Sequence, residues 1–309
     1  MMNNQREFKK AFAFSITMWI VASLLLATVV ILRFAKDELR LSVGLNDKLK
    51  TELIANTVLE TLKFYVPTAD YTFTSLKNSH LTALTYPFPE EIVVDGREYN
   101  LTKKITISLK DTSSMLHVMY ASSEMIASAL TNKSDESAIA TLTDALEDWR
   151  DEDNAPRVNG AEESSYRSLG QQVLVRNSKA IQDIHELKLI QGFENVDFEK
   201  LKRNLYYGRG SGMNLMLIDN RRYLANLLAV DEKFMEEMLE LRVSEPKKFM
   251  RSIELLEHYN DDYFGFYLSK QFRIIIKVQE GEARTILEAI LSFKYLNDRP
   301  YITVSYLIK

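Results

Sequence analysis

The N-terminal part of the chain contains a long stretch without charge. No Asp, Glu, Lys or Arg occurs from Ala11 to Leu32, and the stretch follows a short basic leader. At about 1.5 Å of rise per residue, a helix over this stretch is long enough to cross a hydrocarbon core of about 30 Å. The pattern therefore predicts one membrane-spanning helix at residues 12–33, with the rest of the chain on one side of a membrane.

The charges beside this stretch predict its orientation. The leader carries Arg6, Lys9 and Lys10, whereas the basic residues beyond the stretch are offset by acidic ones. Because basic residues favour the cytoplasmic side, we expect a cytoplasmic N-terminus and an outer domain. A cleaved secretory signal is the alternative, but the stretch is longer than a typical signal core and no small-x-small cleavage site closes it.

Apolar residues continue past the stretch at helical spacing. From Leu39 to Phe64 they recur mostly at steps of three and four, and the next Pro is Pro67. One interpretation is an amphipathic helix packed on its own domain. The other is a continuous rod over residues 12–66, half in lipid and half packed on a globular head.

The remaining pattern changes from strand to helix and back to strand. Residues 67–120 alternate as strands do, and Asp95 and Gly96 predict the two-residue turn of a hairpin. Residues 121–258 have helical spacing around Trp149, around Leu187 and around Met235. Residues 259–309 predict three closing strands. A helical domain inserted into a sheet domain, and thus an α+β fold, explains this order.

Composition and motifs exclude several classes of function. The net charge of −4 gives no reason to expect a nucleic-acid partner, and the absence of Cys excludes disulfides and thiol chemistry. The four His residues have no H-x-x-x-H spacing, and the glycines at 208, 210 and 212 lack the P-loop lysine. We therefore expect no enzymatic activity.

Acidic side chains gather between positions 148 and 163. Alternating carboxylates in a loop can converge on one hard cation, and backbone carbonyls can complete the about six to eight oxygen ligands of Ca²⁺. We therefore predict a calcium site with Asp151, Asp153 and Glu162 as ligands and Asp148 or Glu163 as extra ligands. A solvated acidic loop is the alternative, and the pattern is not that of an EF-hand.

This passage resembles the minor pseudopilin K family of type II secretion systems. The family pattern runs Asp-Trp-x-Asp-x-Asp, Pro, Gly-Ala-Glu, Tyr, then Asn and a Glu-Leu pair. The matching residues here are Asp148, Trp149, Asp151, Asp153, Pro156, Gly160, Ala161, Glu162, Tyr166, Asn177, Glu186 and Leu187. The basic leader followed by an apolar stretch with Trp19 also matches the start of the family.

The resemblance implies a fold and a processing step. The fold is α+β, with a membrane-spanning helical stem packed on a pilin-like antiparallel sheet and a large all-α domain inserted between strands. Prepilin peptidase would remove the leader, residues 1–11, between Ala11 and Phe12. The family's usual Gly before the cleaved bond is Ala here, which is expected to slow processing or shift its site.

The resemblance also implies a place in an assembly. The fifth mature residue is Ile16, where ordinary pseudopilins carry a Glu that pairs with a neighbouring amine in lipid. This predicts a minor pseudopilin of the bacterial inner membrane at the tip of a periplasmic pseudopilus, where it initiates or caps assembly. Its partners would be minor pseudopilins of the H, I and J kinds and the major pseudopilin. A membrane-anchored periplasmic sensor or adaptor that binds a partner protein is the alternative.

Overall fold

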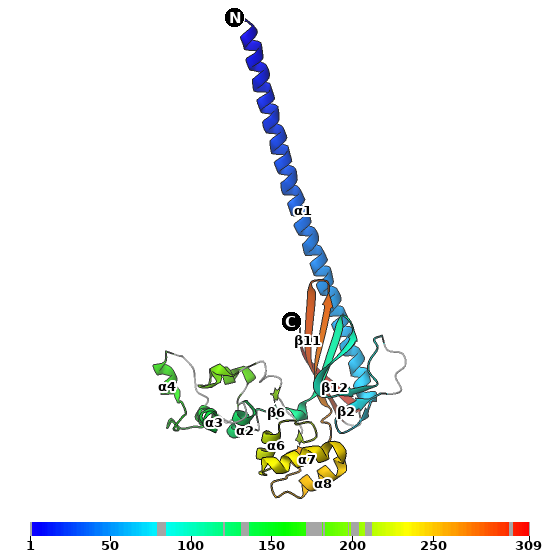
Figure 1. The fold of residues 1–309 in the computed structure, drawn as a ribbon, viewed down its shortest axis with the longest axis vertical. Helices are drawn as coiled ribbons and strands as arrows, with labels where there is room; N and C mark the ends of the chain where they lie inside the picture. Colours follow the sequence, from blue (N-terminus) through cyan, green and yellow to red (C-terminus); the bar gives the residue numbers. More distant parts are fainter. Residues whose placement is uncertain are drawn as a thin grey trace.

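The molecule consists of a long helix, a sheet at the base of that helix and a mixed head beyond the sheet (Figure 1). The computed structural model describes residues 2–78, 85–119, 121–130, 136–170, 181, 183–196, 198, 204–207, 212–296 and 299–308, with the backbone alone for 2–13, 129, 195 and 294–308. The N-terminus lies at the far end of the helix from the head.

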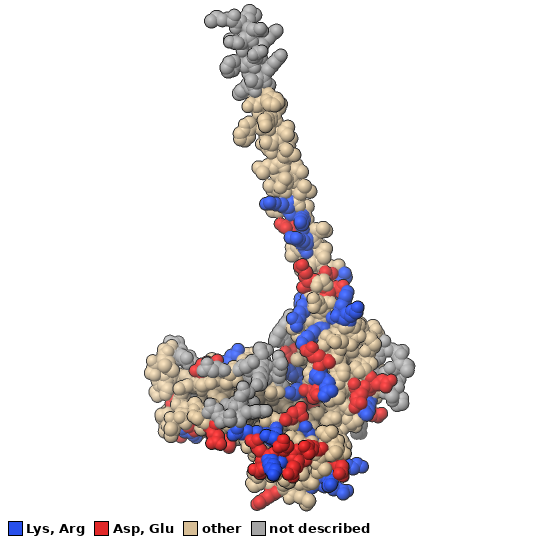
Figure 2. Space-filling model, viewed as in Figure 1, with Lys and Arg blue, Asp and Glu red and all other residues tan. Residues whose placement is uncertain are grey.

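The stem is one unbroken helix, α1 (Met2–Thr68). Among the described residues it is the one helix long and apolar enough to cross a membrane, and Figure 2 shows no charge on the described part nearest the N-terminus. Its base contacts the sheet, with Val58, Leu62 and Val66 fully buried there. The continuous rod is thus confirmed, and it ends one residue after Pro67.

The main sheet has five antiparallel strands in the order β12-β11-β10-β5-β4. The strands are β4 (Asp95–Thr102), β5 (Ile105–Asp111), β10 (Gln271–Glu280), β11 (Ala283–Leu296) and β12 (Arg299–Ile308). Alternate side chains of β10, from Phe272 to Val278, are buried in the same core as the stem. The three closing strands predicted from alternation are confirmed.

The predicted hairpin at Asp95 and Gly96 is wrong. A small sheet contains β1 (Asp70–Tyr71), β2 (Ser75–Lys77) and β3 (Glu91–Val93), so β3 and β4 belong to different sheets. Gly96 has φ of +95° inside β4, where the pairing with β5 shifts register. The glycine therefore serves a β-bulge, while the chain turns between β4 and β5 at residues 103–104.

The insert between β5 and β10 is largely helical, in line with the predicted α+β fold, although it is not helical throughout. Two short parallel strand pairs, β6 with β7 and β8 with β9, lie within it. Its elements are η1 (Thr112–Ser114), β6 (Leu116–His117), α2 (Ser123–Leu130), α3 (Glu136–Arg150), α4 (Glu163–Ser168), η2 (Ile184–Leu189), η3 (Phe193–Asn195), β7 (Leu205–Tyr206), β8 (Met213–Asn214), α6 (Arg221–Leu227), α7 (Glu232–Ser244), α8 (Pro246–Glu254) and β9 (Phe264–Gly265).

The insert has its own hydrophobic core. This core runs from Leu116 to Phe266, beyond the predicted limits of 121–258, because the flanking segments pack on the insert and not on the stem. The helical face predicted around Leu187 forms short 3-10 helices instead of an α-helix. Gly192 has a left-handed backbone, with φ of +88°, and immediately precedes η3 as its N-cap residue.

Asp111 joins the two ends of the insert. Its carboxylate, fully buried at the end of β5, accepts hydrogen bonds from the backbone N–H and hydroxyl of Ser113 on the outgoing segment. It also accepts from the backbone N–H (2.8 Å) and hydroxyl (2.5 Å) of Ser269 on the returning segment. One carboxylate therefore fixes the exit and the return side by side.

We expect Asp111→Ala to lower the free energy of unfolding by about 3 kcal/mol, because the buried backbone N–H of Ser113 and the part-buried N–H of Ser269 lose their acceptor. Denaturant unfolding of the detergent-extracted chain measures this. Asp219→Ala is the control, since its side chain is 81% exposed and its ion pair with Arg242 is worth at most about 1 kcal/mol. Equal losses in the two variants would contradict the role of Asp111.

Candidate metal centre

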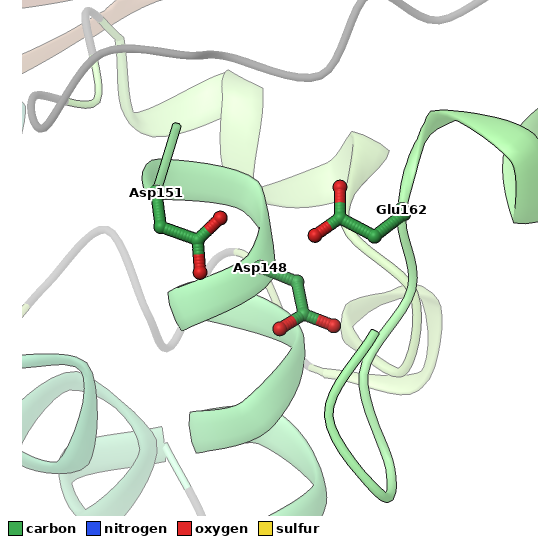
Figure 3. Close-up of side chains that lie close together, drawn as sticks. All are labelled: Asp148, Asp151 and Glu162. Carbon is green, nitrogen blue, oxygen red and sulfur yellow. The ribbon is translucent and has the colours of Figure 1, made fainter. Parts of the chain in front are cut away.

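Three of the acidic residues singled out from the sequence converge in the insert (Figure 3). Asp148 lies in the last turn of α3, Asp151 follows that helix, and Glu162 immediately precedes α4. One carboxylate oxygen from each lies within 4.8 Å of the other two. The cluster is therefore formed by one helix end and the loop that returns past it.

Aromatic packing holds α3 and α4 in place around the cluster. The buried rings of Trp149 and Tyr166 meet edge to face at 5.6 Å. The Trp149 indole N–H donates to Glu186 at 2.8 Å, and the Tyr166 hydroxyl accepts from the backbone of Gln191 at 3.0 Å. Buried aromatic side chains, whose polar groups are hydrogen-bonded, thus hold α3 and α4 on either side of the cluster.

The loop between Asp151 and Glu162 folds closely over Asp148. Asp148 is fully buried and accepts from the backbone N–H of Arg157 at 3.0 Å. Gly160 passes so close that a Cβ there would come within 1.9 Å of an Asp148 oxygen. Only glycine fits at position 160 without moving the carboxylate or the loop.

The Glu162 side chain is 1% exposed, and neither of its oxygens has a hydrogen-bond partner among the described residues. One oxygen of Asp151, Oδ1, is in the same condition. Burial, followed by the charges of Asp148, Asp151 and Asp153, raises the pKa of Glu162 to about 7. Buried oxygens without donors are acceptors in need of a cation or a proton.

Arg157 contributes a cation that sequence reasoning did not select. Its Nη1 donates to Asp148 Oδ1 and to Asp151 Oδ2, each at 2.6 Å. Side-chain hydrogen bonds with Asp151 and then Asp148 raise the pKa of Arg157, so the guanidinium stays charged. Arg157 lies within the acidic motif, but the spacing of the motif does not show that the loop brings Arg157 back against the end of α3.

The other predicted ligands lie outside the cluster. Asp153 is exposed and accepts from the backbone of Ala155, while Glu163 pairs with Arg167. The side chains of Ala11 and Phe12, like Asn177, lie outside the described residues. Ile16 is 44% exposed on α1.

The donor set suits a hard divalent cation. Three carboxylates supply oxygen ligands and three negative charges, against one guanidinium, so the cluster retains net negative charge. Both oxygens of Glu162 and Oδ1 of Asp151 are buried, have no hydrogen-bond partner among the described residues, and can therefore serve as ligands. Ca²⁺ prefers such oxygens and accepts flexible geometry, so the residues present fit calcium.

Comparisons with known proteins agree with this architecture. Residues 117–206, which contain the cluster, match the family model described as Type II secretion system (T2SS), protein K. A segment of 60 residues is 38% identical to the type II secretion system protein K of Klebsiella pneumoniae, and it covers 19% of this chain and 18% of that relative.

The fold is similar to a chain in the crystal structure of the GspK-GspI-GspJ complex from the type II secretion system of enterotoxigenic Escherichia coli. That match has a TM-score of 0.50 at 14% identity and covers 89% of this chain and 99% of the other. The stem, the sheet and the inserted head thus have an arrangement similar to that of the matched chain. The two sequence matches cover only part of the chain, and the structural match shows similarity of fold.

In chelator, the pKa of Glu162 predicts a pH dependence of stability. Its folded pKa of about 7 exceeds the ordinary 4.5, so the folded state holds this proton more tightly than the unfolded state. The stabilisation is fully present below about pH 4.5 and is lost as the pH rises through about 7. Denaturant unfolding from pH 4 to 8 measures it. We expect Glu162→Gln to remove this part of the slope and Glu163→Gln to keep it. The same slope in wild type and Glu162→Gln would contradict the prediction.

Proposed function

We propose that this chain is the protein K-type minor pseudopilin at the tip of a type II secretion pseudopilus, where it initiates or caps the filament. The observation that carries the proposal is the combination of an apolar stem with an inserted head. The match of residues 117–206 to the protein K model and the similarity of fold support it.

The stem supports assembly through helix packing. Beyond the predicted membrane span, apolar side chains from Leu39 to Leu53 stay more than half exposed, although they lie on the same helix as the buried face at its base. Exposed apolar surface of this extent is typical of a contact with another protein. The expected partners are stems of minor pseudopilins of the H, I and J kinds and of the major pseudopilin.

The head supports a place at the end of the filament. In Figure 1, α6, α7 and α8 lie beyond the sheet at the end opposite the N-terminus, and α2 to α4 extend to one side. A subunit stacked on the sheet at the end opposite the N-terminus would overlap these helices. With residues 12–33 of the stem in the inner membrane and the N-terminus in the cytoplasm, the head would lie in the periplasm.

The chain has no cysteine, so single cysteines test this arrangement cleanly. We expect Leu49→Cys in the stem to cross-link to minor pseudopilins, whereas Leu255→Cys, 87% exposed beyond α8, should not cross-link to the major pseudopilin. Cross-links from position 255 to major subunits would place the chain within the shaft. A stem without pseudopilin partners would favour the sensor or adaptor alternative, and the cysteine-free parent is the control.

The same samples test processing. The N-terminal peptide is expected to begin at Phe12 and to carry a methylated amine, after cleavage behind Ala11 by prepilin peptidase. Mass spectrometry identifies it. A chain that begins at Met1, or beyond Leu32, would contradict processing as a pseudopilin.

We also propose that Asp148, Asp151 and Glu162 hold Ca²⁺, with backbone carbonyls and water completing the shell. When bound, the ion would supply positive charge beside Glu162, which has no hydrogen-bond partner among the described residues. The protein's own part is to present the carboxylates from fixed backbone, through the packing of Trp149 and the close approach of Gly160.

We expect Ca²⁺ to stabilise the folded chain by about 2.7 kcal/mol at about one hundred times Kd, and chelator to remove this gain. Thermal unfolding followed by Trp149 fluorescence measures it, in a Trp19→Phe background that leaves one indole. Glu162→Gln should lose the response, and the matched variant Glu163→Gln should keep it. A melting temperature that is the same in millimolar Ca²⁺ and in chelator would refute the calcium site.

A further inference from the structure

The guanidinium of Arg157 lies where a bound cation would have to act. A single atom, Nη1, contacts two of the three clustered carboxylates, at 2.6 Å from Asp148 Oδ1 and 2.6 Å from Asp151 Oδ2. The neighbouring Nη2 is 3.9 Å from a third acid, Glu147. The chain therefore supplies its own cation to the cluster.

The backbone of Arg157 is anchored independently of its side chain. Its N–H donates to Asp148 Oδ2 at 3.0 Å, and its carbonyl accepts from Gly160 at 3.2 Å. The side chain is 39% exposed, so the guanidinium has a path into solvent while the loop keeps its shape. Release of the side chain does not require the loop to unfold.

The guanidinium satisfies the cluster only in part. Both oxygens of Glu162 and Oδ1 of Asp151 remain buried without a partner among the described residues. A planar guanidinium donates hydrogen bonds in fixed directions, whereas a spherical ion attracts oxygens from every side. Arg157 therefore pairs with two carboxylates, whose combined charge exceeds its own, and Glu162 has no hydrogen-bond partner among the described residues.

We propose that Arg157 is an internal competitor for the metal ion. It holds Asp148 and Asp151 together in the ion-free protein, and it gives up at least one of these carboxylates when an ion binds. It thereby lowers the affinity of the cluster for divalent cations and keeps the ion-free loop folded. This inference rests on the proposed calcium site, but it assigns a role to a residue outside the ligand set.

The test compares wild type with Arg157→Gln in the full, detergent-extracted chain. Ca²⁺ is titrated with Trp149 fluorescence and calorimetry, and thermal unfolding is recorded in chelator. We expect the variant to bind Ca²⁺ on the order of tenfold more tightly, because a cation in direct contact with two ligands has been removed. In chelator the variant should melt at a lower temperature than wild type.

Two further variants separate competition from other effects. Arg167→Gln removes the same charge from a side chain that is 72% exposed and paired with Glu163, so it should change the Ca²⁺ Kd less than about twofold. Arg157→Lys keeps the charge but replaces the rigid fork by a flexible ammonium, and it should bind with intermediate affinity. It also provides a folded variant if Arg157→Gln does not fold.

Weaker or unchanged Ca²⁺ binding by Arg157→Gln, with binding by wild type intact, overturns the competitor role and leaves the calcium site standing. Binding by Arg157→Gln alone supports the competitor role and refutes calcium binding by the wild type. Absence of binding in all variants overturns both, while the cross-links from Leu49→Cys test the assembly role independently.

Discussion

The structure depends on the contact between one face of the stem and the main sheet. A helix with apolar residues along most of its length could slide or rotate against a sheet without much loss of buried area. Here a polar pair fixes it: the hydroxyls of Thr51 and Thr285 lie 2.7 Å apart in a buried position, and Lys48 reaches both Thr285 and the carbonyl of Arg284. A buried polar contact tolerates one register, because any shift leaves its groups unsatisfied. Stem and sheet therefore behave as one rigid element.

The insert is a second unit with different requirements. Its core is separate from that of the stem, and its most buried acidic residues are concentrated at Asp111 and in the Asp148 cluster. The carboxylate of Asp111 is held by four hydrogen-bond donors, which lower its pKa, while burial raises the pKa by more than they lower it. Among the residues that the structure describes, Glu162 has no such donors. The two sites show the two ways in which a buried carboxylate is accommodated, with directed donors in one case and with a need for positive charge in the other.

The sequence predicted those parts of the fold that local periodicity determines. The stem, α3, α7 and the closing strands have patterns that one face of a helix or sheet imposes. The pattern failed at Gly96, because a left-handed glycine suits a bulge as well as a hairpin turn, and near Leu187, where tertiary packing favours short 3-10 turns. Asp148, Asp151 and Glu162 could be proposed from composition and resemblance, but the part played by Arg157 could not. It depends on the path of a loop that only the packing of Trp149 and Gly160 defines.

The adjacency of β5 and β10 has a consequence for the evolution of the chain. The insert leaves the sheet at Asp111, at the end of β5, and returns at the start of β10, which pairs with β5. Residues 112–270 therefore occupy the place of an ordinary hairpin loop. Lengthening a loop whose ends are already held together costs little chain entropy, on the order of 0.6 kcal/mol for each doubling. The sheet can therefore accept heads of very different size at this point without any change in its own strands. Such a junction lets a short scaffold of stem and sheet acquire a large accessory domain while the stem keeps its packing on the sheet.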